Sequence, residues 1–417
     1  MFAVRSEPAR ADDRVLTASQ KYGVVYQSDF VAMEGRRVVE VILGIDSLKH
    51  VEPNDFIISM RSFQGGIEWC KLRGSTSFHY VMLRPVKNVW PPFFAHVLKS
   101  SAYIQALRRT TDLIRDGQEL RFSNFAQVDL PVVPLEEQKI IASFLDRETA
   151  KIDALIAEQE KLIALLAEKR QATVSHAVTR GLDPAAPLKD SGAPWIGEVP
   201  SHWEVAPLKR FWSVTDCKHL TAEFVDDGYP IASIREVQSR YVALNEAKRT
   251  TEHFYAQLIE GDRKPLPGDL IFSRNATVGE VAQVTGDHPA FAMGQDVCLL
   301  RRRDTSASAD YLQDVIRSGV VIEQLKNIMV GSTFKRVNVE EIRCLTVPMP
   351  PPDEQRRIAQ FLKAEVLRFE SIEQDAGRSI NLLRERRAAL ITAAVTGQID
   401  VRSAVQVTDS PMANLAA

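Results

Sequence analysis

Several features that would point directly to a function are scarce or missing in this sequence. The 417 residues contain no apolar run of about 18 residues, so no membrane span is predicted. The N-terminus carries Glu7, Asp12 and Asp13 and has no apolar stretch, which argues against a signal peptide. The net charge of −2 lacks the positive excess by which many nucleic-acid-binding proteins are recognised.

Cysteine is also rare. The four cysteines are isolated from one another, which excludes a disulfide framework and a zinc motif and favours a reducing, cytoplasmic setting. The eight histidines do not cluster at ligand spacings either, so no metal site is expected. The cysteines are Cys70, Cys217, Cys298 and Cys344.

Catalytic motifs are missing as well, since no Walker loop or nucleophile elbow occurs. Residues 90–93 contain the Pro-Pro-Phe of an amino-methyltransferase motif without the preceding Asp or Asn, so they are better interpreted as a helix start. Asp55, Glu68 and Lys71 resemble a metal nuclease set only weakly, because Glu68 and Lys71 need not share a strand face. The sequence therefore favours recognition without catalysis.

A tandem repeat is the strongest feature present. Residues 134–145 return as residues 351–362, and Gln138 and Gln355 are 217 positions apart (355 − 138). The same offset relates residues 177–179 to residues 394–396. A register kept without a gap across such a stretch indicates an internal duplication.

Each repeat predicts a long helix. Pro134 suits the first turn, Glu136 and Glu137 suit the positive end of the helix dipole, and Gly181 is a stop signal. About 45 helical residues span roughly 65 Å, which is typical of a coiled coil. The predicted apolar seam, expected to hold the helices together and to dock partners, comprises Ile141, Leu145, Ile152, Leu155, Leu162 and Leu166 in the first helix and Ile358, Leu362, Phe369, Ile372 and Leu383 in the second.

The stretch before each long helix has the pattern of a mixed α/β module. In module one, residues 38–42, 55–61 and 80–84 predict strands and residues 93–109 predict an amphipathic helix. Module two repeats this skeleton, but residues 64–71 have no visible counterpart in its loops, as in two binding modules of different specificity. The matching stretches of module two are residues 268–275, 297–301 and 311–326.

We therefore predict an α+β fold in which two mixed α/β modules are separated by two long antiparallel helices that form a coiled coil, with pseudo-two-fold internal duplication. The alternative is that each helix folds separately onto its own module. The predicted division is module one at residues 1–134, the first helix at 135–182, module two at 183–348, the second helix at 349–400 and a flexible tail at 401–417.

The sequence resembles the specificity subunits of type I restriction–modification systems over nearly its whole length. The resemblance lies in the twin helix starts at residues 134–142 and 351–359, the segment at 190–203 and the helix end at 393–400. It implies two target-recognition domains that read a bipartite, asymmetric site in double-stranded DNA. It also implies docking of two methyltransferase subunits and of motor-nuclease subunits. S-adenosylmethionine, ATP and Mg²⁺ are then expected on those partners, while this chain binds no cofactor and catalyses nothing.

One departure concerns the start of module one. Trp203, in the opening segment of module two, lies 152 residues before Gln355 (355 − 203), and the same count back from Gln138 falls before Met1. Module one is therefore expected to lack that segment, through either a late start or a truncation.

Candidate DNA contacts follow from the side chains that read base edges and phosphates from loops. A helix of roughly 65 Å would separate two half-sites by at most about 19 base pairs. A coiled-coil scaffold without a DNA role and a self-contained methyltransferase or nuclease remain the alternatives. The candidates after the shared strand are Ser59, Arg61 and Gln64 in module one and Ser273, Arg274 and Asn275 in module two, followed by Lys71, Arg73, Lys218, Lys335 and Arg336.

Overall fold

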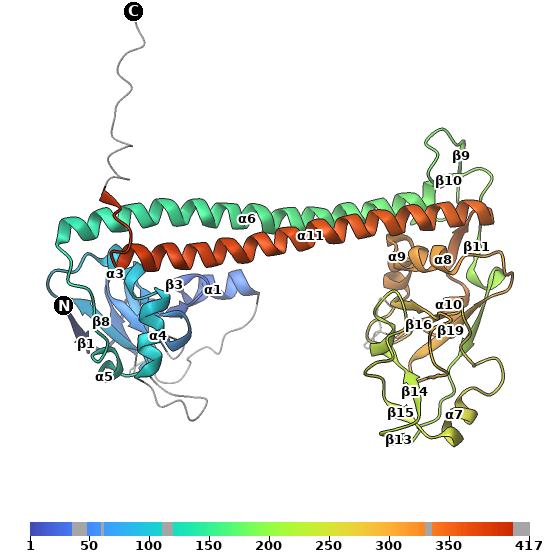
Figure 1. Cartoon of the computed structure of the whole chain (residues 1–417), viewed down its shortest axis with the longest axis horizontal. Coiled ribbons are helices and arrows are strands. Elements are labelled where there is room, and N and C mark those ends of the chain that lie inside the picture. The colour runs from blue at the N-terminus through green and yellow to red at the C-terminus, as the bar shows by residue number, and fades with distance from the viewer. Residues whose placement is uncertain (36–47, 60–61, 111–119, 330–335, 403–417) are drawn as a thin grey trace, which may run out of the picture. The chain divides into compact units, whose positions relative to one another are not determined.

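The computed structural model describes residues 1–35, 48–59, 62–110, 120–329 and 336–402. Two compact units are present: Met1–Glu160 with Gly377–Ala417 (unit one), and Lys161–Ala376 (unit two). Each unit combines one α/β module with parts of both long helices (Figure 1). The strand predicted at 38–42 and most of the predicted tail lie outside the described residues. Among the residues described, no helix is long and apolar enough to cross a lipid bilayer.

The two long helices of the duplication are present. Helix α6 spans Leu135–Arg180 and helix α11 spans Pro352–Val395. Acidic residues occupy the first turn of both helices, where they interact favourably with the helix dipole. Gly181 and Gly397 follow the two helices with φ angles of 73° and 72°, a left-handed conformation that terminates a helix at little cost for glycine.

The long helices pair antiparallel within each unit. In unit one, Asp153 pairs with Arg387 and Glu160 with Arg384, so the numbering of α6 rises as that of α11 falls. In unit two, Arg170 of α6 lies 3.5 Å from Glu370 of α11. Because both helices also contribute to one core in each unit, the alternative of separately folded helices is wrong.

Module one is built on a four-stranded antiparallel sheet of order β1-β8-β5-β6. Its core packs strands β5 and β8 and helix α3 against the ends of both long helices. The sheet strands are β1 (Phe2–Arg5), β5 (Phe56–Ile58), β6 (Glu68–Trp69) and β8 (Val81–Pro85); two further two-stranded sheets pair β2 (Leu16–Ser19) with β3 (Gly23–Tyr26) and β4 (Lys49–Val51) with β7 (Gly74–Thr76); the helices are α1 (Gln27–Glu34), α2 (Ser62–Gly65), α3 (Pro91–Val97), α4 (Ser101–Arg109) and α5 (Phe122–Phe125).

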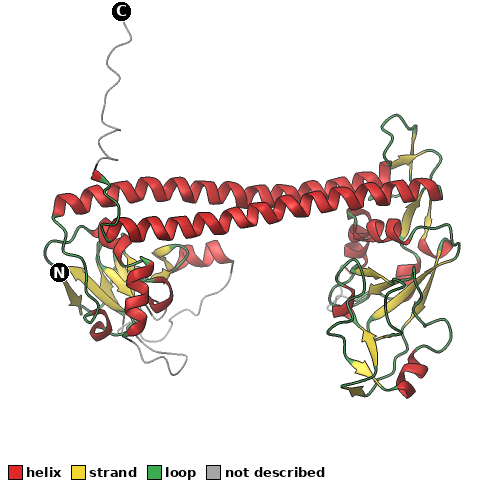
Figure 2. Cartoon of the chain, viewed as in Figure 1, coloured by secondary structure: helices red, strands yellow, loops and turns green. Residues whose placement is uncertain are grey.

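Module two repeats this sheet as β12-β19-β16-β17, again fully antiparallel. Figure 2 shows the strands of the modules in yellow and the two long helices in red. It adds a second sheet and an opening segment that pairs with the strand before α11. The strands are β12 (Trp212–Asp216), β16 (Leu270–Ser273), β17 (Val281–Gln283) and β19 (Val297–Arg302), then β13 (Phe224–Val225), β14 (Tyr229–Ala232), β15 (Arg249–Thr250) and β18 (Ala292–Met293), and β9 (Leu188–Asp190), β10 (Glu198–Pro200), β11 (Glu204–Pro207) and β20 (Thr346–Met349); the helices are α7 (Glu252–Leu258), α8 (Ala309–Arg317), α9 (Gly319–Met329) and α10 (Val339–Arg343).

Three local predictions are corrected by the structure. The helix expected at residues 93–109 is two helices, α3 and α4, and its counterpart in module two is also two, α8 and α9. The break falls at Ser100 and Ser318, whose hydroxyls donate to the carbonyls of Val97 and Val315 and so satisfy the end of the first helix. The strand expected at 55–61 ends at Ile58. Residues 64–71, which were expected to have no counterpart in module two, include β6, and β17 occupies the equivalent position in the sheet of module two.

Candidate nucleic-acid interface

A buried aspartate stabilises the turn before the central strand of each module. Asp55 Oδ2 accepts the N–H of Glu52 at 2.9 Å, and Asp269 Oδ2 accepts the N–H of Leu266 at 2.8 Å. Arg5 pairs with Asp55 at 2.6 Å, whereas Arg301 pairs with Asp269 at 2.7 Å. The turn that leads into the predicted DNA-reading strand is therefore the same in both modules, although the arginine comes from β1 in one and β19 in the other.

The residues at the end of the central strand of module two are less exposed than predicted. Ser273 is buried, and its hydroxyl donates to the backbone oxygen of Asn275 at 3.1 Å. Arg274 is 3% exposed, and its guanidinium lies 2.6 Å from Asp216. The prediction that these two side chains meet base edges finds no support in their positions, because a buried, paired arginine holds the loop together and does not face solvent.

Asn275 and Arg336 are brought together beside this buried pair. They form an isolated antiparallel β-bridge, and Arg336 Nη2 lies 3.7 Å from Asp296. Ala276 and Asp296 have φ angles of 55° and 64°, which non-glycine residues rarely adopt outside functional or strained loops. Asn275 and Arg336 therefore lie on one loop surface, a juxtaposition that sequence reasoning did not foresee. The predicted Lys335 lies outside the described residues.

In module one the candidates occupy different environments. Ser59 is buried at the end of β5, while Gln64 is exposed on α2. Lys71 is exposed with Nζ 4.5 Å from the centre of the Trp69 ring, and Arg73 pairs with Asp12 at 2.9 Å. The predicted Arg61 lies outside the described residues. Gln64, Lys71 and Arg73 thus reach solvent, whereas Ser59 does not.

The weak nuclease set of module one is engaged in other contacts. Asp55 is paired with Arg5, and Glu68 lies 2.6 Å from Lys99. Burial raises the pKa of the Glu68 carboxyl, an effect that Lys99 opposes. Because Lys71 packs on Trp69, these residues do not form a joint metal site.

A cluster of possible metal ligands was missed in the sequence. Asp216, Cys217 and His219 place ligand atoms within 4.8 Å of one another. The Arg274 guanidinium contacts both Asp216 and the Cys217 sulfur, so a positive charge already occupies this cluster. Burial raises the pKa of the Cys217 thiol, which also disfavours a thiolate ligand. The neighbouring candidate Lys218 is paired with Glu260.

The seam of the long helices follows a strict heptad that the sequence reading placed one residue off at two positions. Leu155 and Leu162 are 47% and 38% exposed, whereas Ile156 and Ile163 are partly buried. When Leu145 is placed at position d of a heptad repeat, the two isoleucines fall at positions a. Adjacent residues differ by about 100° around a helix, so the neighbouring leucines point away from the seam. The predicted seam residues Ile141, Leu145, Ile152, Leu166, Ile358, Leu362 and Phe369 are buried, and Ile372 and Leu383 are partly buried.

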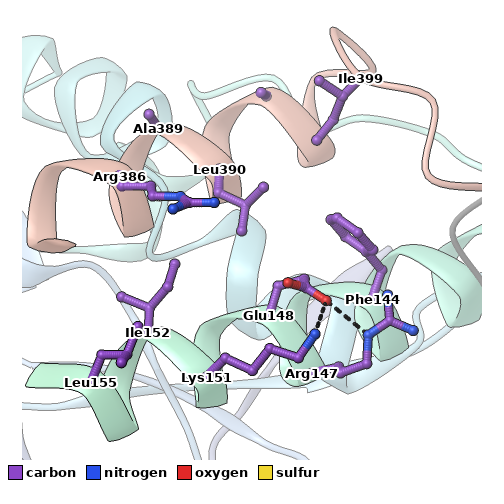
Figure 3. A pocket seen from close by; sticks show the side chains of 11 residues that line it. Phe144, Arg147, Glu148, Lys151, Ile152, Leu155, Arg386, Ala389, Leu390 and Ile399 are labelled. Carbon is purple, nitrogen blue, oxygen red and sulfur yellow. Dashed lines mark hydrogen bonds and ion pairs between the residues drawn. The ribbon is translucent and has the colours of Figure 1, made fainter. Parts of the chain in front are cut away.

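Exposed apolar residues remain on the outer surface of the helix pair. In unit one, Leu155 of α6 borders a groove of about 720 Å³ beside α11 and the segment after it (Figure 3). Lys151 and Arg147 both bond to Glu148 at 2.9 Å and hold the pKa of that carboxyl below its usual value. The groove thus has apolar walls and a charged rim; the apolar lining residues are Phe144, Ile152, Leu155, Ala389, Leu390, Ala393 and Ile399.

Comparison with known proteins identifies the family of this chain. The family described as "Type I restriction modification DNA specificity domain" matches residues 12–164 and 200–376, which together make up most of the chain and cover most of both modules. The chain belongs to this family. It is a type I restriction–modification specificity subunit by descent, and the internal repeat corresponds to the two matched segments.

Individual relatives agree with this assignment. The specificity subunit of the type I restriction enzyme StySPI from Salmonella potsdam is 30% identical, covering 84% of this chain and 75% of that protein. The EcoKI specificity subunit from Escherichia coli is 24% identical, with coverages of 84% and 75%. Both are similar to this chain over 84% of its length.

Solved structures share the fold. The HsdS subunit from Thermoanaerobacter tengcongensis superimposes with a TM-score of 0.50 at 16% identity, covering 84% of this chain and 83% of that one. A chain from a structure titled for complex assembly and conformational transition of the type I R-M system gives a TM-score of 0.60 at 16% identity, covering 96% and 98%. Both structures therefore share the fold of this chain.

Proposed function

We propose that this chain reads a bipartite, asymmetric DNA sequence, with one half-site recognised by each module. The observation that carries the proposal is the repetition of one sheet order and one helix seam with different loops at the end of the central strand. Equal scaffolds position two reading surfaces in the same way, and unequal loops give them different preferences. The relatives named as specificity subunits support this reading.

Within the modules, we propose that polar residues that reach solvent make the DNA contacts. In module one these are the exposed Gln64, Lys71 and Arg73, and in module two they are the exposed Arg336 and the partly buried Asn275 and Lys218. Amide side chains suit base edges, and cations suit phosphates. Arg61 and Lys335 stay predictions. Basic partner subunits would supply part of the DNA affinity, because this chain has almost no net charge. Affinity for DNA depends on counterion release, which grows with the number of cations that contact phosphates.

We further propose that the outer surface of the helix pair docks two methyltransferase subunits, and that motor-nuclease subunits join the assembly. The groove beside Leu155 and the exposed Leu382 in unit one, and Leu162, Leu165 and Leu367 in unit two, are apolar surface that the described part of the chain leaves exposed. Clusters of exposed leucines mark association surfaces. S-adenosylmethionine, ATP and Mg²⁺ would then be bound by those partners, and this chain would be a non-catalytic subunit.

A module exchange tests the reading of DNA. Residues 206–347 are replaced by the corresponding module of another specificity subunit, and methylated adenines are mapped in DNA treated with the assembled complex. One half of the methylated sequence should change while the other stays the same. A change in both halves or in neither would contradict the proposal, and a scaffold without a DNA role would show no sequence-dependent footprint.

Charge substitution tests the docking surface. Leu155→Glu with Leu382→Glu should leave the chain folded, since both side chains are exposed, but should weaken its co-purification with the methyltransferase subunit. Ala172→Glu, at an exposed position of α6, serves as the matched control. Assembly that is equally strong in both variants would exclude this surface.

A further inference from the structure

The glutamine of each repeated segment is buried and fully bonded. In unit one, Gln138 is 0% exposed, and its Oε1 accepts the N–H of Trp90 at 2.8 Å. Its Nε2 donates to the backbone oxygens of Val133 at 2.8 Å and Asn88 at 3.0 Å. One side chain therefore joins the first turns of α6, the segment before it and the start of α3.

Gln355 makes two equivalent bonds in unit two, and its Nε2 also lies 3.2 Å from the Met349 sulfur, where Gln138 instead donates to Asn88. Its Oε1 accepts the N–H of Ser308 at 2.9 Å, and its Nε2 donates to the backbone oxygen of Pro350 at 2.8 Å. Pro350 lies 217 positions after Val133 (350 − 133), the same offset as that between the glutamines. Trp90 and Ser308 are the N-cap residues of α3 and α8, so the amides that donate to the two glutamines are also equivalent.

Burial alone does not account for a glutamine at these positions. An apolar side chain would fill the same space without the cost of removing a carboxamide from water. A carboxamide accepts in one direction and donates in another, so it fixes the orientation of the backbone segments that it joins. The same two backbone partners in both copies indicate that orientation is what the residue supplies.

The joined segments connect each module to the helix pair of its own unit. Helices α3 and α8 pack in the module cores beside the apolar residues of α6 and α11. A module that turned about the start of its long helix would have to break the bond to the N-cap amide of α3 or α8. The glutamine thus lies where the module, which is proposed to read DNA, meets the long helices, which are proposed to set the spacing of the half-sites.

We propose that Gln138 and Gln355 are positioning residues that lock each module onto its helix pair and thereby set where each half-site is read. This inference rests on the proposed function. It predicts that loss of the glutamine bonds relaxes the required distance between half-sites more than it lowers activity on the preferred site.

Gln138→Met and Gln355→Met test the proposal, because methionine keeps the length of glutamine and removes its hydrogen bonds. Gln360→Met, at an exposed position of α11, is the matched control. Each full-length chain is assembled with its methyltransferase subunits, and methylation is measured on duplexes with the mapped target and with spacers one base pair shorter or longer.

Wild type and Gln360→Met should prefer the mapped spacer. Each of the other two variants should lower that preference about tenfold, which corresponds to ~1.4 kcal/mol. A uniform loss of activity on all spacers would indicate mere destabilisation and overturn the inference. If wild type itself ignored spacer length, the proposed reading of a split site would fail, and the positioning role with it.

Hydrogen exchange on the free chain separates the two failures and needs no variant to fold. In wild type, the amides of Trp90 and Ser308 should exchange as slowly as the core amides of α3 and α8, since both are bonded to a buried acceptor. Fast exchange at these amides would overturn the lock, whatever the outcome with DNA.

Discussion

The two modules show which parts of a duplicated fold were kept and which were free to change. Five buried core positions on the long helices of unit one, Ile141, Ala142, Leu145, Ala394 and Val395, have counterparts in unit two at an offset of 217, namely Ile358, Ala359, Leu362, Ala177 and Val178. By contrast, the ion pairs around the reading loops differ between the modules. The packing of each module against the long helices is therefore shared between the two units, whereas the loops at the end of the central strand differ between them.

Truncation of the seam is the strongest way to break this equivalence. Leu145→Ala in unit one and Leu362→Ala in unit two should each lower the free energy of unfolding by about 2–5 kcal/mol, since both side chains are fully buried in equivalent cores. Urea unfolding with hydrogen exchange of each module checks this. A loss in one unit only would show that the seams are not equivalent. Leu165→Ala, at an exposed position, is the control.

The shared turn offers a second comparison. Asp55→Ala and Asp269→Ala remove the acceptor of a turn amide and leave Arg5 or Arg301 without its buried partner. Breaking such a pair should cost about 3 kcal/mol in either module. The measurement is urea unfolding at pH 7. A module that tolerated the change would show that its turn is held by other contacts.

The pH dependence should separate the modules. His96 of α3 and Asp314 of α8 occupy equivalent positions, because each lies the same number of residues after the N-cap residue of its helix, Trp90 or Ser308 (96 − 90 = 314 − 308). Burial lowers the pKa of His96, which Asp146 opposes, whereas burial raises the pKa of Asp314 to about 6, which Arg240 opposes. Module one should therefore lose stability as pH falls below the unfolded pKa of 6.5, because the unfolded histidine takes up the proton first.

Module two should respond in the opposite direction. Its stability should fall by about 1–3 kcal/mol as pH rises from 3.8 to about 6, because the folded state holds the Asp314 proton more tightly. Hydrogen exchange of the two modules between those pH values is the measurement. His96→Gln and Asp314→Asn should flatten the respective slopes, and parallel slopes in both modules would contradict the prediction.

The smallest effect is expected at the surface of the helix pair. Asp153→Ala in unit one removes an exposed pair with Arg387, and Arg170→Ala in unit two removes one with Glu370. Each should change stability by less than about 1 kcal/mol, and the change should shrink further in high salt. Thermal unfolding at two salt concentrations checks this. A larger loss in either unit would mean that surface charge helps to hold the helices together.

Much of the fold could be predicted because it rests on interactions near in sequence. The long helices follow from uninterrupted helix-forming residues between Pro134 and Gly181, and the duplication follows from a constant offset. The heptad that includes Ile156 and Ile163 was also present in the sequence, so the choice of Leu155 and Leu162 was an error of register. The break at Ser100 and Ser318 depends on local serine bonds that helical periodicity does not reveal.

By itself, the sequence determined that two α/β modules alternate with two long helices, because repeats and hydrophobic periods are properties of neighbouring residues. The tertiary structure alone decided that Arg274 is buried against Asp216, that Asn275 meets Arg336 and that Gln138 binds the N-cap of α3. Each of these contacts joins segments far apart in the chain, and burial removes an arginine or a glutamine from solvent only after those segments have come together.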